Sequence, residues 1–205
     1  LEPYGGEVLH LPVGTTTLLS AALASGGLAG FGVAAQRLRL GMDPYRLAAF
    51  GALLGLAAFS CVIFAAPTES LALFAFGTIL IGFGSGLFAH CTLTAAMASV
   101  APGQIGLVLG IWGAVQASAA GASIAAGGLL RDGVSVLAEH GLLGEALTGP
   151  ATGYSFVYHL EIAFLFATLI AIGPLVRRAD TDSRARVALT LDLADLPPHK
   201  LSLPR

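Results

Sequence analysis

The sequence has few charged side chains. Only 11% of its 205 residues are Asp, Glu, Lys or Arg, whereas 56% are hydrophobic and the mean hydropathy is +0.83. A soluble domain carries about a quarter charged residues, so this composition excludes a large water-soluble domain and indicates an integral membrane protein. The formal net charge of -2 is also small. Because nucleic-acid-binding proteins show a basic stripe, we expect the lipid bilayer, and no nucleic acid, among the partners.

The sequence also lacks the motifs of catalysis and of closed metal sites. Cys61 and Cys91 lie inside apolar runs without metal-type spacing, and we expect them to behave as small buried hydrophobes. No nucleophile elbow, phosphate loop or HExxH motif is present. The GFGSG stretch at 82–86 follows no strand, so its glycines are interpreted as packing residues rather than as a dinucleotide fingerprint. The sequence therefore does not predict an enzyme.

Long uncharged runs are what the chain does contain. Residues 71–95 include no Asp, Glu, Lys or Arg, and an apolar run longer than about 18 residues is long enough to cross a bilayer core as a helix. Four other runs have a comparable character. We predict an all-α, polytopic transmembrane helix bundle with five spans, at residues 15–35, 47–66, 71–98, 105–130 and 154–175.

Small residues recur within these runs at helical spacing. Gly26 and Gly30 are four residues apart, as are Gly51 and Gly55, so each pair shares one helix face and allows another helix to approach closely. The run at 105–130 has small residues along its whole length, which predicts packing against protein on more than one side. They are Gly106, Gly110, Gly113, Ala117 and Gly121.

The remaining segments are more polar. Residues 1–14 are too polar to span, and Pro3–Gly6 has the composition of a turn. In the long connection at 131–153, apolar residues mixed with Glu139 and His140 favour an interfacial amphipathic helix, although its glycines oppose one. The charged, proline-bearing residues 179–205 are expected to form a flexible tail.

The distribution of basic residues predicts the orientation. With five spans, the loop at 36–46 and the residues after the last span, from 176 on, lie on the same side, and together they hold every Lys and Arg except Arg131. By the positive-inside rule, we expect the loop and the C-terminus in the cytoplasm. Residues 1–14 and the 131–153 connection are then outside, and an odd number of spans predicts a preceding helix in a longer polypeptide.

Few polar groups inside the runs are candidates for chemistry. Glu161 lies roughly two turns into the last span, where a charged carboxylate would cost a few kcal/mol. It is therefore expected to be protonated, paired or facing a cavity. Proton coupling and a hydrogen bond to a polar ligand are the functional interpretations. A structural hydrogen bond to a neighbouring helix, or a side chain reaching the outer surface, is the alternative.

Two histidines within the runs are the other candidates. His90 lies deepest, and a neutral imidazole there can ligate a metal, including the magnesium of a chlorophyll-type ring. The glycines at 82, 84 and 86 would leave room for something flat. The alternative is a core histidine bonded to the hydroxyl of Ser85 or Thr94. His159, beside Tyr158 and Glu161, has the same ambiguity.

The two ends of the chain resemble a known family. LEPYGGEV at 1–8, a TTxL-type helix start at Thr15–Leu18, and GYSFVYHLEIAFLFATLIAIGPLVRR at 153–178 are similar to the PucC/LhaA family of phototrophic bacteria, the bacteriochlorophyll delivery branch of the major facilitator superfamily. The resemblance covers essentially the whole chain, as the C-terminal half of such a protein. The end motifs are fairly specific, and the helices between them are generic.

That resemblance implies a twelve-helix parent in which the present spans are the eighth to twelfth. It also implies a multi-pass protein of the bacterial inner, intracytoplasmic photosynthetic membrane that handles bacteriochlorophyll. The implied partners are light-harvesting antenna polypeptides or the reaction centre-antenna complex. One departure concerns the Gly-x-x-x-Asp-x-x-Gly-Arg pattern of superfamily transporters: Gly32 is followed by Gln36, Arg37 and Arg39 without the acidic residue. This argues against ordinary transporter gating by that loop.

Three hypotheses follow. The leading one is an assembly factor that docks antenna polypeptides and presents bacteriochlorophyll, with His90 or His159 at the magnesium and Glu161 bonded to a ring substituent. The second is a secondary transporter of a small solute that uses Glu161 as its proton site. The third is a structural membrane subunit without a ligand.

Overall fold

A computed structural model of the chain describes residues 1–149 and 151–194, with side chains described through residue 178. Every regular element in this part of the chain is a helix. Five of the helices are long and apolar enough to cross a membrane, which confirms the predicted all-α bundle of five spans. The elements are α1 (Glu2–Glu7), α2 (Val13–Arg39), α3 (Pro44–Ala65), α4 (Leu71–Ala98), the 3-10 turn η1 (Pro102–Gln104), α5 (Ile105–Glu139), the 3-10 turn η2 (Glu145–Leu147) and α6 (Ala151–Ala194).

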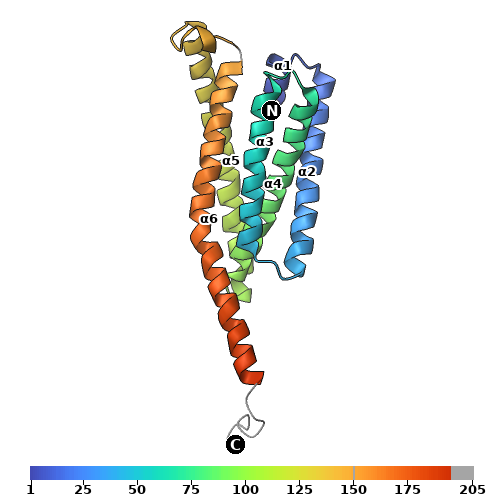
Figure 1. Ribbon diagram of the computed structural model, residues 1–205, viewed down its shortest axis with the longest axis vertical. Helices are drawn as coiled ribbons and strands as arrows, with labels where there is room; N and C mark the ends of the chain where they lie inside the picture. Colours follow the sequence, from blue (N-terminus) through green and yellow to red (C-terminus); the bar gives the residue numbers. More distant parts are fainter. Residues whose placement is uncertain (150, 195–205) are drawn as a thin grey trace, which may run out of the picture.

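The helices form a group of three with a hairpin beside it (Figure 1). Helix α4 packs along both α2 and α3, while α6 packs against α3 and α5. The α2–α3 connection lies at the end toward which α6 extends, and α1 lies at the other end. We call the first the arginine end, because it carries the arginines other than Arg131 among residues 1–178: Arg37, Arg39, Arg46, Arg177 and Arg178. We call the second the tyrosine end, after Tyr4, Tyr154 and Tyr158.

Glycine allows α4 to lie almost backbone to backbone with α2. A Cβ atom at Gly26 or Gly30 would overlap the carbonyl oxygen of Ile79 or Phe83 on α4. From the other side, a Cβ at Gly86 would overlap the carbonyl oxygen of Gly27. In lipid, helices gain no hydrophobic free energy by associating, because the acyl chains are as apolar as the helix faces. Association therefore depends on close packing, which small residues allow. The predicted packing role of Gly26 and Gly30 is thus confirmed, and its partner is α4.

The contact between α3 and α4 uses the second glycine pair. A Cβ on Gly51 would lie 2.8 Å from the carbonyl oxygen of Gly84, and one on Gly84 would lie 2.8 Å from the carbonyl oxygen of Gly51. Gly55 instead faces Leu165 of α6, at 3.0 Å from a leucine methyl carbon. The glycines at 51 and 55 therefore contact two different helices, α4 and α6, and Leu165 of α6 lies more than a hundred residues later in the chain.

A glycine and an aspartate fix the turn at the arginine end. Gly41 has φ +83°, which only glycine adopts without strain, and its N–H donates to the Leu38 carbonyl at 3.0 Å. Met42 N–H donates back to the Arg37 carbonyl at 3.1 Å, completing a Schellman motif. Asp43 then caps α3 by accepting from the Arg46 N–H at 2.9 Å. The turn thus sets how α2 and α3 leave this end.

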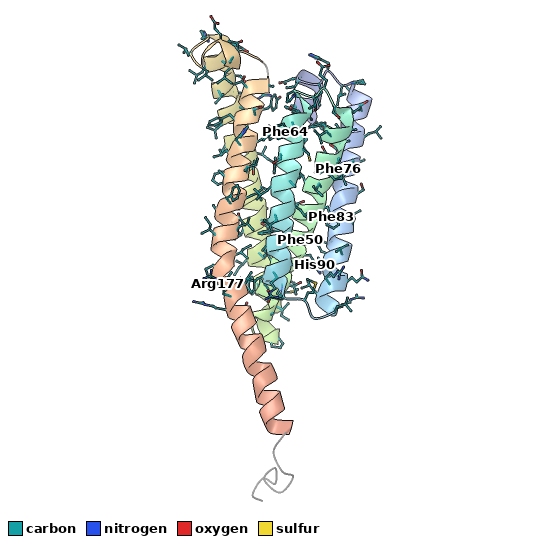
Figure 2. The ribbon with its side chains drawn as sticks, viewed as in Figure 1. Phe50, Phe64, Phe76, Phe83, His90 and Arg177 are labelled. Carbon is teal, nitrogen blue, oxygen red and sulfur yellow. The ribbon has the colours of Figure 1, made fainter. Side chains whose placement is uncertain are left out.

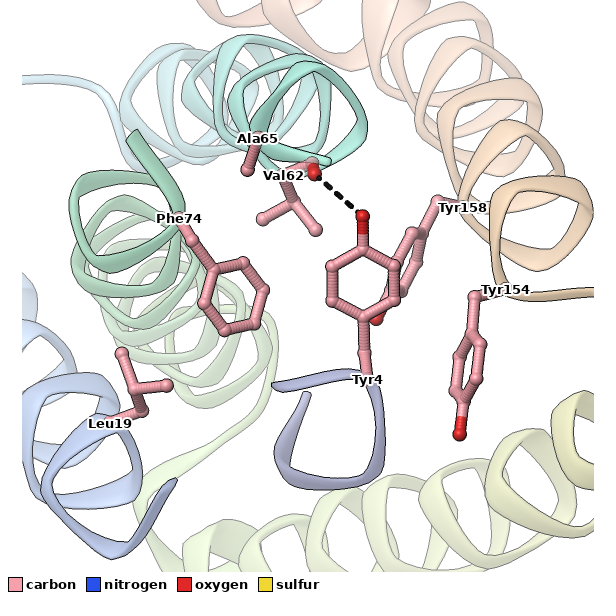
Figure 3. Close-up of a cluster of buried hydrophobic side chains, with 7 residues drawn as sticks. All are labelled: Tyr4, Leu19, Val62, Ala65, Phe74, Tyr154 and Tyr158. Carbon is pink, nitrogen blue, oxygen red and sulfur yellow. Dashed lines mark hydrogen bonds between the residues drawn. The ribbon is translucent and has the colours of Figure 1, made fainter. Parts of the chain in front are cut away.

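An aromatic cluster closes the tyrosine end (Figure 3). Tyr4 of α1 is 1% exposed and its ring centroid lies 5.3 Å from that of Phe74 and 5.4 Å from those of Tyr154 and Tyr158. Its hydroxyl donates to the Val62 carbonyl at 3.5 Å. Burial raises the pKa of Tyr4, so the hydroxyl stays a neutral donor. The cluster joins α1, α3, α4 and α6.

Three sequence expectations differ from the structure. Pro3–Gly6 lies within the helix α1 rather than in a turn, because its residues are held between the longer helices. The interfacial helix expected in the long connection is instead the last part of α5, which continues to Glu139 and shortens the connection. Helix α6 continues to Ala194, where a loose tail was expected, and residues 195–205 of that tail lie outside the described residues.

Candidate functional site

An apolar cavity of about 770 Å³ lies between the three-helix group and the hairpin. Small residues leave this space open on the helix faces that line it, including Gly27, Gly51, Gly55 and Gly84. Aromatic rings of Phe31, Phe59 and Phe88 border it, and Leu165 of α6 contributes on the hairpin side. Ligand cavities of proteins typically measure 300–1,000 Å³ and are mostly apolar. The cavity therefore has the size and lining of a site for a large apolar molecule.

Three polar side chains line this cavity. Ser85 donates its hydroxyl to the Gly82 carbonyl at 2.8 Å, and Thr168 donates to the Phe164 carbonyl at 2.8 Å. Both hydroxyls are thereby satisfied within their own helices. Gln116 of α5 makes no hydrogen bond to any described residue. Its amide is the lining group with donor and acceptor capacity left for a ligand.

His90 lies next to the cavity but behind one of its walls. It is on α4, toward the arginine end (Figure 2), and its ring meets the ring of Phe31 edge-on with centroids 4.2 Å apart. The expected hydroxyl bond is absent, because Ser85 is bonded to its own helix and Thr94 donates to the backbone carbonyl of His90 at 2.8 Å. His90 Nδ1 is the one buried side-chain nitrogen or oxygen among the described residues that has no hydrogen-bond partner.

The flat space predicted around the glycines near His90 is only partly present. Gly82 is in contact with the backbone of Leu23 on α2, so helix packing fills that side. Gly84 and Gly86 also pack on neighbouring helices, but they border the cavity as well. The open space therefore lies beside α4 and not directly over the imidazole.

His159 has a different environment. It is exposed on α6, and its Nδ1 is 2.6 Å from the carbonyl oxygen of Ser155. A carbonyl can only accept, so Nδ1 carries the proton, and Nε2 is left with its lone pair. A histidine that is held in this way is ready to ligate a metal, since the second ring nitrogen fixes the tautomer and the ring orientation.

Glu161 lies between the tyrosine cluster and the cavity. The i, i+3, i+7 spacing of Tyr158, Glu161 and Leu165 puts all three on one face of α6, and Leu165 contacts Gly55 of α3. The carboxyl group is partly buried and forms no ion pair with a described residue. The structure thus separates the three predicted site residues. His159 and Glu161 lie in the first turns of α6, toward the tyrosine end, whereas His90 lies on α4 toward the arginine end.

A polar network that the sequence did not predict lies at the tyrosine end. The Tyr154 hydroxyl donates to Glu7 at 2.6 Å, and Arg131 lies 3.2 Å from the same carboxylate and 4.9 Å above the Tyr154 ring. Arg131 also bonds Asp132. These groups tie α1 to both helices of the hairpin. The sequence signal for it was the position of Arg131, the single Lys or Arg that lies outside the 36–46 loop and the residues after the last span.

The chain matches the family model described as "PUCC protein" over residues 1–180. It is 50% identical over 177 residues to an uncharacterized protein in the puhA-bchM intergenic region of Rhodobacter capsulatus, which covers 86% of this chain and 37% of that protein. It is 48% identical over 179 residues to Protein PucC of Cereibacter sphaeroides, and 43% identical over 180 residues to Protein PucC of Rhodobacter capsulatus. These two matches each cover 87% of this chain and 38% of the relative.

The chain thus spans less than two fifths of the length of these curated relatives. No solved structure matches it.

Proposed function

This chain belongs to the PucC family, and we propose on that basis that it is part of a membrane assembly factor for the light-harvesting complexes of phototrophic bacteria. In this proposal it docks antenna polypeptides, or the reaction centre-antenna complex, and presents bacteriochlorophyll to them. Family membership over residues 1–180 is the observation that carries the proposal. The apolar cavity beside α4 supports its pigment-handling part.

The residues around the cavity fit the chemistry of bacteriochlorophyll. The pigment would supply a large, flat, apolar ring with a central magnesium that takes a nitrogen ligand. Glycines at the cavity wall let a flat ring approach the helix backbone, and the Gln116 amide is available to a polar ring substituent. The unpartnered Nδ1 of His90 and the oriented ring of His159 are the candidate magnesium ligands. Glu161 lies one helical turn before Leu165 of the cavity lining, and in this proposal it bonds a second ring substituent.

We place the protein in the intracytoplasmic photosynthetic membrane with its arginine end in the cytoplasm. Among residues 1–178, the arginine end has one carboxylate, Asp43, against its five arginines. The tyrosine end has one arginine, Arg131, with Glu7 and Asp132 bonded to it. The positive-inside rule then orients the bundle.

The pigment proposal is tested by purifying the full chain from pigmented membranes and recording its absorption spectrum. We expect bound bacteriochlorophyll, with a lowered amount or a shifted band in His90→Phe or His159→Phe, because each removes a candidate ligand. His140→Phe is the matched control. His140 has its Nδ1 2.7 Å from the Val136 carbonyl, as His159 has with Ser155, but lies beyond the end of α5. Absence of pigment from the wild-type chain would contradict the proposal.

A second variant tests the cavity itself. Ala89→Phe adds a ring to the cavity lining, and we expect it to reduce the bound pigment while leaving the bundle folded. Ala120→Phe, on an exposed part of α5, adds the same ring outside the cavity and is expected to leave the pigment unchanged. Equal amounts of bound pigment in the two variants would show that the pigment does not bind in this cavity.

The carrier hypothesis has one observation in its favour, the position of Glu161 without an ion-pair partner among the described residues. A carrier that uses this carboxyl group for proton coupling would lose coupled transport in Glu161→Gln. Uptake of the solute into liposomes, with a proton gradient imposed across their membrane, measures that loss. Transport by the wild type that collapses in Glu161→Gln, with no pigment bound, would favour the carrier over the assembly factor.

A further inference from the structure

A second cavity, of about 420 Å³, opens at the arginine end on the other side of α4 from the pigment cavity. Its floor is apolar and fully packed, since Leu47 is 4% exposed and Leu87 is 0% exposed. Its rim is open, with Phe50 51% exposed and Met42 41% exposed. Phe83 of α4 continues the lining toward the middle of the bundle (Figure 2). The result is an apolar groove that is accessible from the lipid side.

Two guanidinium groups border the same groove. Arg37 comes from the last turns of α2 and Arg46 from the first turn of α3. Arg37 is two residues before the end of its helix and Arg46 is two residues after the start of its own. The groove therefore changes from apolar to cationic where the helices leave the membrane.

The surrounding charges favour an anion at this place. Arg39, Arg177 and Arg178 lie at the same end of the bundle, and among the side chains described through residue 178 Asp43 is the one carboxylate there. The Asp43 side chain accepts a hydrogen bond from the backbone N–H of Arg46 and caps α3. It therefore belongs to the turn, and the charged side chains that line the groove itself, Arg37 and Arg46, are both cationic. A zwitterionic headgroup would bring an ammonium into this field, whereas an anionic one brings none.

We propose that this groove binds one anionic glycerophospholipid, with its phosphate between Arg37 and Arg46 and an acyl chain along Phe50 and Phe83. Guanidinium groups match phosphate through two parallel N–H donors, which a Lys cannot reproduce. Basic pockets between transmembrane helices at the cytoplasmic side are suited to acidic headgroups. The bound lipid fills the groove between α2 and α3, so that a lipid of the inner leaflet packs against both helices at this end. This site does not depend on pigment binding.

Native mass spectrometry of the full chain in detergent tests the site. Phosphatidylglycerol and phosphatidylcholine are added at equal concentration, and we expect one phosphatidylglycerol to be retained in preference. Arg37→Gln should lower that retention about tenfold, because a hydrogen-bonded charge pair is lost, and Arg37→Lys should restore only part of it. Arg39→Gln removes the same charge two residues away without touching the groove, and should leave retention within about twofold, since an exposed charge at that distance is screened.

Three outcomes would overturn the proposal. Equal retention of the two lipids would show that the groove does not select a lipid by the charge of its headgroup. An equal loss in Arg37→Gln and Arg39→Gln would show a diffuse field and no site. Displacement of phosphatidylglycerol by inorganic phosphate at the same concentration would show that the arginines bind an anion without its acyl chain. Phe50→Ala adds a check on the apolar part: it should lower retention while leaving the preference for phosphatidylglycerol, and unchanged retention would remove the acyl-chain contact.

Discussion

Replacing Gly30 with alanine tests whether backbone contact between α2 and α4 holds the bundle together. A Cβ at this position would overlap the Phe83 carbonyl oxygen and would lie 2.9 Å from the Phe83 carbonyl carbon and 3.1 Å from the Leu87 nitrogen. All three atoms belong to backbone, which cannot turn aside as a side chain can. The two helices must therefore move apart, and every contact along their shared face weakens.

The expected magnitude follows from two opposing terms. Overpacking of a close-packed interface costs about 1–3 kcal/mol, while alanine in place of glycine gains up to about 1 kcal/mol of helix propensity. The gain is small here, since a transmembrane segment remains helical when its neighbours separate. We expect Gly30→Ala to lower the free energy of unfolding by about 2 kcal/mol, which raises the unfolded fraction up to about 30-fold.

Gly32 provides the matched control. It lies on the same helix two residues later, and a Cβ there would have open space around it. Gly32→Ala makes the same chemical change and is expected to be neutral or slightly stabilising.

The assay uses Cys91 as a probe of unfolding. This thiol on α4 is 0% exposed, so a thiol-reactive dye reaches it only when the helices separate. In a Cys61→Ala background, we expect faster labelling of Gly30→Ala than of Gly32→Ala across a heating series. Equal labelling rates in the two variants would refute the argument that α2 and α4 need direct backbone contact.

Three further predictions concern the two ends of the bundle. Tyr4→Ala should destabilise the chain by about 3–5 kcal/mol, as for other buried aromatic truncations, whereas Tyr4→Phe should cost under about 1 kcal/mol because its hydrogen bond is long at 3.5 Å; similar unfolding temperatures for the two variants would contradict this. Tyr154→Phe removes the bond to Glu7 and should expose residues 1–12 to protease sooner, with the core stability changed by only about 1 kcal/mol; unchanged cleavage would mean that the network does not hold α1. Arg37→Cys and Arg177→Cys should react with a membrane-impermeant thiol reagent from one face of the membrane, because both lie at the arginine end; labelling from opposite faces would refute the topology.

Much of the fold could be predicted because lipid imposes a simple rule. Every backbone polar group must be satisfied within its own segment, so an uncharged run as long as residues 71–95 has to be a helix. The same reasoning identified the packing glycines Gly26 and Gly30, since spacing by four places both on one face. It did not identify their partner. Gly55 has the same pattern and meets Leu165 of α6, which no local feature of the sequence indicates.

The candidate site was less predictable. The sequence identified His90, His159 and Glu161 as polar groups in apolar runs, but their mutual distance depends on how the helices are arranged. The structure puts Glu161 one helical turn from Leu165 of the cavity lining and His90 against Phe31, and the hydroxyls expected to bond His90 donate to their own helices. The α5 glycines expected to pack on several sides, such as Gly110 and Gly113, have open space around them among the described residues.

The sequence by itself determined that this chain is a five-helix membrane protein, because hydropathy and length are local properties and the bilayer acts on each run separately. Its end motifs also determined the family. Only the tertiary structure decided which faces of the helices meet. That choice created the glycine-walled cavity on one side of α4 and the arginine-bordered groove on the other. Both are spaces between helices, and the shape of such a space depends on crossing angles and distances that arise only when distant segments pack together.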